Sequence, residues 1–236
     1  MAGHRFYLGQ DALPNARDDV TLTGDVAYRI TRVLRMHAGE RLALFSGVRE
    51  FECELIETGK RVRARLLEEL PPQAERTHLT LYQALIRPNR FEWLIEKVTE
   101  LGVDRIVPLL TERAAVRASE IGASRLERWR RIAIEATEQS GRRCVPAIAA
   151  PVSYAAALND ANGCRVFAWE GLCEAHGATI EPDRGGISLF VGPEGGWSDA
   201  EVEQARAAAA TFMGLGPTTL RAETAAIVAA AILLLD

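Results

Sequence analysis

The sequence lacks the features of a membrane or exported protein. None of its apolar runs approaches the ~20 residues that a membrane-spanning helix requires. Its opening residues, MAGHRFYLGQD, have no apolar core of the kind that a signal peptide carries. We therefore expect a cytoplasmic protein that does not enter a membrane.

Paired cysteines and clustered histidines are also missing. No two cysteines form a Cys-x-x-Cys pair, and the histidines are scattered along the chain. The residues concerned are Cys53, Cys144, Cys164, Cys173, His4, His37, His78 and His176. This pattern argues against a zinc site and against a disulfide framework. We expect reduced thiols and no bound metal.

Two common nucleotide-binding fingerprints are absent. The chain contains neither Gly-x-Gly-x-x-Gly nor Gly-x-x-x-x-Gly-Lys-[Ser/Thr]. Their absence argues against a nucleotide-dependent oxidoreductase and against a site for a nucleoside triphosphate.

What the sequence does have is the composition of an ordinary globular protein. Hydrophobic residues make up 48% and charged residues 25% of its 236 residues, enough for one large domain or two small ones. The net charge of −4 is unevenly spread, with 0 over residues 1–72, +3 over 73–150 and −7 over 151–236. A polyanionic partner should therefore meet the first two thirds of the chain.

Residues 1–72 have the pattern of a small β-barrel. Short strands are predicted over 4–8, 41–47, 50–58 and 61–70, and apolar residues at helical spacing predict one helix within 25–40. The following segment, LPPQAERT (70–77), has two prolines and no periodic pattern, so it is the best linker candidate.

After this segment, predicted strands and helices alternate. Strands are expected over 79–86, 105–110, 165–169 and 187–191, and helices over 90–102, 124–141, 198–211 and 222–236. Ser124 with Glu127, and Ser198 with Glu201, have the spacing of capping boxes at helix starts. The alternation predicts a parallel sheet covered on both faces. The last helix is apolar on most sides and should be buried.

The stretch LFVGPEGGWSDAEVEQ (189–204) places a glycine-rich turn between a strand and a helix. Such a junction favours an anion or a nucleotide. This loop, however, carries Glu194 and no lysine, so a triphosphate would meet a negative charge. A cation or a ribose hydroxyl suits the carboxylate better, and S-adenosylmethionine offers both. A tight turn that merely needs glycines is the alternative.

A second glycine-rich loop, MGLGPTTLRAET (213–224), leads into the last helix. Its polar residues could simply cap that helix. An arginine and a glutamate beside an otherwise apolar helix are less easily explained in this way. Because both loops follow neighbouring strand candidates, they could converge on one ligand at the C-terminal edge of the sheet.

The two loops in this order resemble those of the SPOUT methyltransferases. GPEGGWS followed by LGPTTLRAETA resembles the RsmE family in particular, the 16S ribosomal RNA uridine-N3 methyltransferases. The resemblance runs nearly end to end, because HRFYL, VLRMHAGERLALFSG, EWLIEKVTELGVDRIVPLLTER and EQSGRRCVP look like that family's blocks in the right order. It rests on the ordered set, since a single block such as ELG is weak evidence.

The resemblance implies an α/β protein with a PUA-like RNA-binding β-barrel over 1–72 and a SPOUT methyltransferase domain over 73–236. Residues 187–236 would form a trefoil knot that holds S-adenosylmethionine, and the chain would form a homodimer. The residues expected to contact the cofactor are Trp169, Glu170, Gly192, Glu194, Gly195, Gly196, Leu215, Gly216, Leu220, Arg221, Glu223 and Thr224.

The chain departs from the family pattern in two places. Leu-Gly-Pro-Thr-Thr-Leu-Arg stands where the family has Leu-Gly-x-Arg-Ile-Leu-Arg, so Thr218 replaces the first arginine and Arg221 is kept. If that first arginine binds RNA or stabilises the loop, this chain does so less strongly or by another residue. RPNRFEW (87–93) replaces a lysine-rich version, and Arg87 and Arg90 preserve its charge.

The implied reaction is methylation of N3 of a specific uridine of 16S ribosomal RNA in the small subunit. The base must be exposed and its N3 made nucleophilic, so the protein's tasks are alignment and favouring the uridine anion. Arg221 is the catalytic candidate that would stabilise this charge, although it could equally fix the loop through Glu194 or Glu223. The sequence identifies no clear general base.

Arginines are the expected contacts to the RNA. The candidates are Arg5, Arg29, Arg32, Arg35, Arg87 and Arg90. Arg29, Arg32 and Arg35 repeat every third residue, which places them along one side of the first helix, where a plain solvated face is the alternative. A second basic set flanks a later helix: Arg125, Arg128, Arg130, Arg131, Arg142 and Arg143. Phosphate contacts of this kind position RNA without reading its sequence.

Two other functions stay open at this point. A methyltransferase of the same fold could act on another ribosomal base or on transfer RNA, because the cofactor motif says little about the substrate. A non-catalytic RNA-binding module is the second, and binding of S-adenosylmethionine would discriminate it.

Overall fold

The computed structural model describes residues 3–9, 13–47, 49–74, 76–114, 116, 120–172 and 185–235. The chain forms two compact units, Met1–Glu75 with Thr137–Val145, and Arg76–Ala136 with Pro146–Asp236. Within the described ranges, no helix has the length and apolar character needed to cross a membrane.

The described cysteines Cys53, Cys144 and Cys164 are free thiols. The same part of the chain holds no group of three His, Cys, Asp or Glu side chains that could bind a metal ion. Cys173 and His176 lie outside the described residues.

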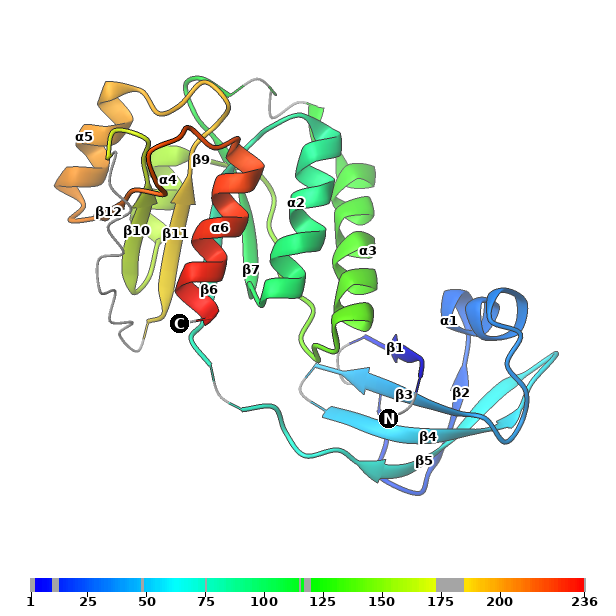
Figure 1. Ribbon diagram of the computed structural model, residues 1–236. Helices are drawn as coiled ribbons and strands as arrows, with labels where there is room; N and C mark the ends of the chain where they lie inside the picture. The colour runs from blue at the N-terminus through cyan, green and yellow to red at the C-terminus, as the bar shows by residue number, and fades with distance from the viewer. Residues whose placement is uncertain are drawn as a thin grey trace. The chain divides into compact units, whose positions relative to one another are not determined.

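The first unit is built on a curled five-stranded sheet (Figure 1). Its strands are β1 (Arg5–Tyr7), β2 (Asp19–Leu22), β3 (Arg41–Ser46), β4 (Arg49–Glu57) and β5 (Val62–Glu69). They lie in the order β1-β3-β4-β5-β2, with β1 parallel to β3 and the other pairs antiparallel. The four predicted strands are confirmed. β2 was missed because its sequence, DVTL, is too short to show a clear period.

The predicted helix of this unit is shorter than expected and changes its pitch. An α-helix, α1 (Gly24–Tyr28), continues directly into a π-helix, η1 (Arg29–Val33). The amide of Leu34 bonds to the carbonyl oxygen of Arg29, five residues earlier, at 2.8 Å. Ile30 anchors this segment because it is fully buried among the core residues of the sheet. The wider turn alters which side chains share a face.

A buried ion network holds the segment Thr137–Val145 within the first unit. Arg5 Nε and Arg143 Nε donate to the two carboxylate oxygens of Glu50 at 2.7 and 2.6 Å. Glu50 and Arg143 are only 5% and 7% exposed. Arg5 also donates to carbonyl oxygens of the segment 137–142, so its guanidinium is engaged inside this unit.

The second unit contains a parallel sheet of seven strands. They are β6 (Leu79–Ala84), β7 (Arg105–Leu110), β8 (Ala147–Ile148), β9 (Val152–Ser153), β10 (Cys164–Ala168), β11 (Ile187–Val191) and β12 (Thr211–Met213). The order is β12-β10-β11-β6-β7-β8, with β9 also paired to β7. All pairs are parallel, as the alternating pattern predicts.

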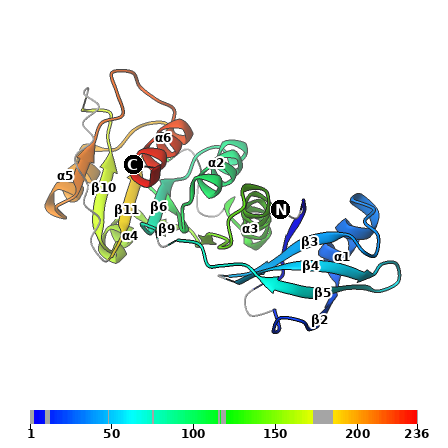
Figure 2. The ribbon, with the colours of Figure 1, turned by 60° about the horizontal axis from the view of Figure 1, so that its bottom comes forward.

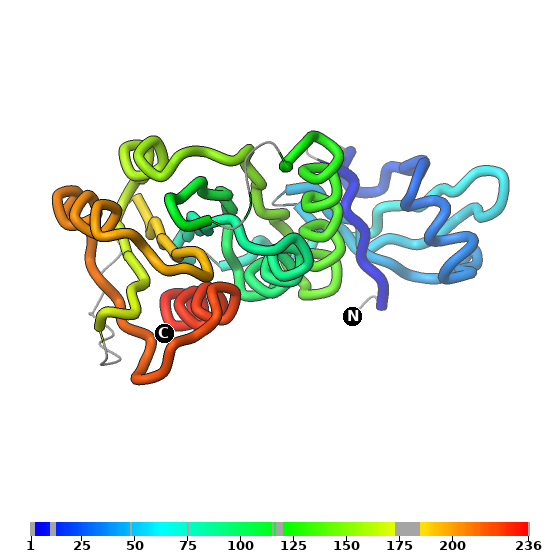
Figure 3. Tube along the Cα trace, turned by 90° about the horizontal axis from the view of Figure 1, so that it is seen from above, coloured from blue at the N-terminus to red at the C-terminus, as the bar shows by residue number. Residues whose placement is uncertain are grey.

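Helices cover both faces of this sheet (Figure 2 and Figure 3). On one face, α6 (Ala222–Leu235) packs on the central strands and on α2 (Pro88–Leu101). On α2, Phe91 stacks with Trp129 of α3 (Ala123–Ser140). On the other face, α4 (Tyr154–Asp160) and α5 (Asp199–Ala207) pack on an aromatic layer that includes Phe167 and Phe190. α4, β8 and β9 are too short to show a clear period and were not predicted from the sequence.

One of the two predicted capping boxes forms. Ser198 Oγ accepts from the amide of Glu201 at 3.3 Å, and the Glu201 carboxylate accepts from the amide of Ser198 at 2.9 Å. Ser124, in contrast, does not cap α3. That helix already begins at Ala123, and Gly122 supplies the carbonyl for its first bonds.

The last helix is only partly buried, which differs from the expectation. Its alanines Ala226, Ala229 and Ala230 face the core with no exposure, whereas Ile232 and Leu235 are 36% and 69% exposed. An all-apolar helix gives no period from which the buried side could be read. A trefoil knot over 187–236 stays a prediction.

Candidate active site

Three loops meet at the carboxyl edge of the second unit's sheet. β12, β10 and β11 are adjacent and parallel, so the residues that follow them leave the sheet at the same edge. These are residues 169–172 after β10, 192–198 after β11 and 214–221 after β12. The convergence of the two glycine-rich loops, expected from the sequence, comes from this strand order.

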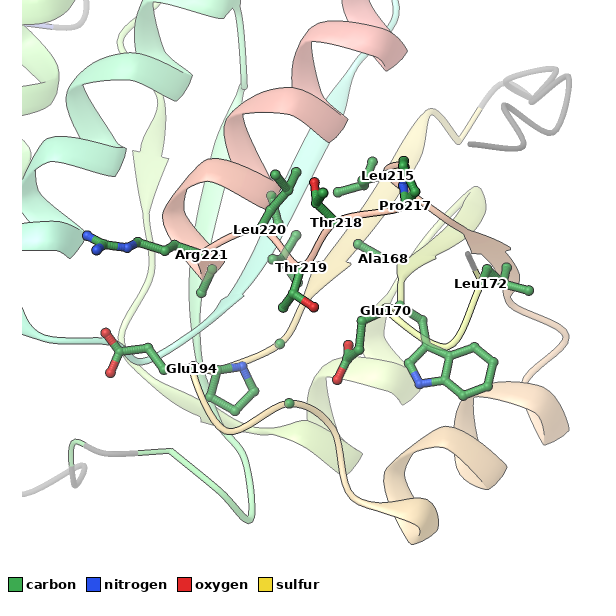
Figure 4. Close-up of a pocket in the computed structure, with 18 of the residues that line it drawn as sticks. Ala168, Glu170, Leu172, Glu194, Leu215, Pro217, Thr218, Thr219, Leu220 and Arg221 are labelled. Carbon is green, nitrogen blue, oxygen red and sulfur yellow. The ribbon is translucent and has the colours of Figure 1, made fainter. Parts of the chain in front are cut away.

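The loops enclose a cavity of about 440 Å³. Its walls come from the end of β10 and the residues after it (168–170 and 172), the first glycine-rich loop (191–194 and 196), the second (215–222), Ala225 of α6 and Arg90 of α2. Figure 4 shows the two loops on opposite sides of the opening, with Glu170 and Thr219 between them. The volume is within the range of small-molecule sites.

The first glycine-rich loop is shaped by close contacts. A Cβ on Gly196 would lie 2.4 Å from Glu170 Oε1, and the φ of Gly196 is +70°. A Cβ on Gly192 would lie 3.0 Å from the indole of Trp197. That indole donates to the carbonyl oxygen of Ala168 at 3.0 Å, which fixes the loop to the end of β10. The glycines therefore let the loop pass close to its neighbours.

Gly195 lies on the other side of this loop. Its Cβ position faces Arg113, 3.2 Å from the Arg113 Cβ, and Gly195 does not line the cavity. Arg113 Nη1 donates to the carbonyl oxygens of Gly195 and Trp197 at 3.4 and 3.0 Å. Arg113 thus supports the loop from outside the cavity. No local pattern indicates this role, because Arg113 is 82 residues away from Gly195 in the chain.

The second loop leaves more open space. A Cβ on Gly216, whose φ is +115°, would meet no atom of the described residues within 4 Å. Leu215, Thr218, Thr219 and Leu220 line the cavity beside it. Thr218, which stands at the family's arginine position, thus adds a hydroxyl group to the cavity wall instead of a charge.

Arg221 lies at the rim. Its side chain extends away from Glu170 and Thr219 (Figure 4). The residue is exposed, and its guanidinium has no ion-pair partner among the residues that the structure describes. The two ion pairs that the sequence suggested for it, with Glu194 and Glu223, are made by Arg90 instead.

Arg90 joins the two walls of the cavity. Its Nη1 lies 2.8 Å from Glu194 Oε1 on the first loop and 3.5 Å from Glu223 Oε1 in the first turn of α6. Glu223 is 6% exposed, and its second oxygen, Oε2, is buried without a hydrogen-bond partner in the described part of the chain. One guanidinium is therefore shared by two carboxylates. The cluster of Arg90, Glu194 and Glu223 carries a net negative charge, which favours a cationic ligand.

The structure brings most of the predicted cofactor residues together. Nine of the twelve line the cavity: Trp169, Glu170, Gly192, Glu194, Gly196, Leu215, Gly216, Leu220 and Arg221. Gly195, Glu223 and Thr224 do not, because they lie behind the loop or inside the first turn of α6. Arg90, Thr218 and Thr219 also line the cavity, and none of the three was predicted as a cofactor contact. The threonines adjoin predicted residues, whereas Arg90 comes from α2, whose approach no local pattern shows.

The other predicted RNA contacts fall into two groups. Arg5 is engaged by Glu50, as described above. Arg29 lies 2.8 Å from Glu138 and covers the ring of Phe6. Arg87, Arg32 and Arg35 are exposed. The three arginines of the first helix thus differ in their surroundings, because Arg29 is engaged within the unit whereas Arg32 and Arg35 are exposed.

The second basic set is also divided. Arg142 and Arg143 are buried, at 9% and 7% exposure. Arg128 is bound bidentately by Glu92, with distances of 2.6 and 2.8 Å, and Arg130 pairs with Glu127. The buried members hold the protein together and do not form a surface.

Known proteins that are similar to this chain are RNA methyltransferases. Residues 73–234 match the model of a family described as an RNA methyltransferase domain. Ribosomal RNA small subunit methyltransferase E of Synechocystis is 35% identical over 221 residues, covering 90% of this chain and 71% of the relative. The protein of that name from Bacillus subtilis is 34% identical, covering 89% and 87%.

This chain belongs to the ribosomal RNA small subunit methyltransferase E family. The structure of the family member from Neisseria gonorrhoeae, bound to S-adenosyl methionine, superposes with a TM-score of 0.86 at 33% identity, covering 97% of this chain and 95% of the other. A putative methyltransferase from Legionella pneumophila, in complex with the cofactor SAM, gives 0.87 at 31% identity over 97% and 96%. The family resemblance seen in the sequence is thereby confirmed.

Proposed function

We propose that this chain transfers a methyl group from S-adenosylmethionine to N3 of a specific uridine of 16S ribosomal RNA, in the small ribosomal subunit and in the cytoplasm. The observation that carries the proposal is the cavity between the two glycine-rich loops. The chain that forms it matches ribosomal RNA small subunit methyltransferases over most of its length.

The residues of the cavity fit this cofactor. Glu170 and Glu194 supply carboxylates that suit a sulfonium charge and ribose hydroxyls, and the glycines allow close approach to the backbone. Gly216 faces open space in which a ligand can lie against the main chain. The nine lining residues from the predicted set are the proposed direct contacts. Gly195, Glu223 and Thr224 would act through their neighbours.

When bound, the cofactor supplies an electrophilic methyl group. The chain's own task is to exclude water, to hold the uracil ring with N3 towards that group, and to stabilise the negative charge that the ring carries once N3 has lost its proton. Arg221 is suited to the last role because its guanidinium is not held by another side chain in the described residues. Arg90 is already shared by Glu194 and Glu223, so it would hold the cavity walls together.

We further propose the division into a PUA-like RNA-binding domain over 1–72 and a methyltransferase domain over 73–236. A knot over 187–236 is supported by the path of the chain. It leaves the edge strand β12, passes beside the loop 192–196 at the cavity, and returns to the middle of the sheet as α6. A homodimer is supported by the exposed apolar residues of α6, Ile232 and Leu235, and by Trp93 of the adjoining α2.

The test is methyl transfer from radiolabelled S-adenosylmethionine. Small subunits from a strain that lacks the modification would be offered to the protein beside naked 16S ribosomal RNA and transfer RNA, and the labelled nucleoside would be identified. N3-methyluridine in the subunits is the expected product. Label in transfer RNA, or in a different base, would contradict the assigned substrate while leaving the cofactor site in place.

A further inference from the structure

A surface of the first unit, away from the cavity, combines exposed apolar and cationic side chains. We call it the helical patch, and it consists of Tyr28, Arg32, Val33, Leu34 and Arg35. Tyr28 and Val33 are each 60% exposed and Leu34 is 36% exposed. Together they are half of the six large hydrophobic residues that are exposed in the described chain, and they fall within seven consecutive residues. Such a concentration marks an interaction site.

The backbone holds these side chains outward on a fixed frame. Ile30, two residues after Tyr28, and Met36, which follows Arg35, are buried at 0% and 5% exposure, and the amide of Met36 bonds to the carbonyl oxygen of Ile30 at 2.9 Å. Ile30 belongs to the π-helix η1, a form that is frequent at functional sites. Arg35 has a φ of +53°, a conformation that costs free energy in any residue other than glycine.

Two of the charges in this region have no counter-ion among the residues that the structure describes. Arg29 is engaged by Glu138 and lies over Phe6, so its charge is used within the unit. For Arg32 and Arg35, in contrast, no acidic partner lies within ion-pair distance in the described part of the chain. An exposed aromatic ring and two exposed guanidinium groups without an acidic partner in the described residues therefore lie within eight consecutive residues.

We propose that the helical patch binds unpaired nucleotides of the RNA substrate. Tyr28 stacks on an exposed base, Val33 and Leu34 extend the apolar contact, and Arg32 and Arg35 contact the flanking phosphates. Aromatic side chains beside arginines are the usual means of holding single-stranded RNA, because every base has a face on which to stack. Paired RNA hides those faces, so the patch distinguishes unpaired from duplex RNA. This inference deepens the proposed function and rests on it.

The test compares single-stranded with duplex RNA on the full-length protein. The probes are a fluorescent oligouridine of about 12 nucleotides and a duplex of the same length, and the readout is anisotropy. Tyr28→Ala should weaken oligouridine binding at least fivefold, whereas Tyr28→Phe, which keeps the ring, should stay within twofold of the wild type. Binding of the duplex should change less than binding of the single strand.

The arginines have their own signature. Arg32→Gln and Arg35→Gln should each reduce the slope of log K against log salt by about 0.7, the value of one phosphate contact to a single strand. Arg41→Gln is the matched control, because it removes one exposed arginine charge of the same unit that belongs to neither predicted RNA-binding set and is paired with Glu52. It should leave both the affinity and the slope unchanged within twofold.

Affinity for S-adenosylmethionine, measured on the same variants, separates the possible failures. It should be unchanged, which shows that the variants are folded. If Tyr28→Ala binds oligouridine as tightly as the wild type, the proposal that the helical patch binds RNA is wrong, whereas the proposed methyltransferase activity is not affected. Loss of methyl transfer to assembled subunits without any loss of oligouridine affinity would also overturn that proposal, and would assign the surface to a ribosomal protein. A wild-type protein that binds no S-adenosylmethionine would instead refute the proposed function.

Discussion

A methyl group placed at Gly196 tests the cavity directly. The Cβ of Gly196→Ala would lie 2.4 Å from Glu170 Oε1, so one of the two groups must move. The Glu170 carboxylate is the end of an exposed, flexible side chain and will rotate away. The fold therefore survives, but the carboxylate no longer lies beside the loop where the cofactor is proposed to bind.

The two effects of this substitution have different sizes. The φ of +70° costs a non-glycine residue about 1–2 kcal/mol of stability. Loss of a hydrogen bond to the charged carboxylate costs about 1.5–3 kcal/mol of binding, or roughly 10- to 150-fold in Kd. Titration calorimetry with S-adenosylmethionine and urea unfolding of the same preparation measure both.

The control is Gly39→Ala in the first unit. Gly39 has a φ of +90° and no atom within 4 Å of its Cβ position, so it carries the same backbone cost without touching the cavity. It should lose similar stability and keep wild-type affinity for the cofactor. If Gly196→Ala also binds S-adenosylmethionine within threefold of the wild type, the cofactor does not lie against this loop and the proposed site is wrong.

Three further predictions concern other parts of the molecule. Arg143→Ala should lower the free energy of unfolding by about 3 kcal/mol in urea, because it removes one of two partners of buried Glu50, and a loss below 1 kcal/mol would contradict a structural role. Leu235→Glu should convert a dimer into a monomer in sedimentation experiments, and an unchanged dimer would place the interface elsewhere. Burial raises the pKa of Cys53 to about 12, so its thiol stays protonated in the native state at pH 8. It should then react with iodoacetamide only after unfolding, and rapid native alkylation would contradict this assignment.

The choice between Arg90 and Arg221 shows where reasoning from sequence reaches its limit. The second loop correctly indicated that a guanidinium and carboxylates would gather at the start of the last helix. One of its two interpretations made Arg221, two residues before Glu223, the partner of Glu194 or Glu223. The structure gives that position to Arg90, which is 104 residues away from Glu194 and arrives on α2. Packing of α2 against α6 decides the pairing, and no local pattern records it.

The first unit gives a second example. Spacing by three placed Arg29, Arg32 and Arg35 on one side of a helix, but α1 ends at Tyr28, η1 contains Arg29 and Arg32, and Arg29 is engaged by Glu138. In the sequence, Arg5 and Arg143 cannot be told from surface arginines. In the structure, both donate to buried Glu50. Charge counts cannot distinguish a buried pair from an exposed one, because burial depends on which distant residues surround the group.

The sequence by itself determined what depends on neighbours along the chain. Periodicity predicted the alternating strands and helices, the Ser198 capping box followed from spacing, and the glycine-rich loops after β11 and β12 predicted a ligand site. Only the tertiary structure decided which loops meet, which side of α6 stays exposed, and which arginines have counter-ions. These depend on strand order and on packing between segments far apart in the chain, and such contacts leave no short-range pattern in the sequence.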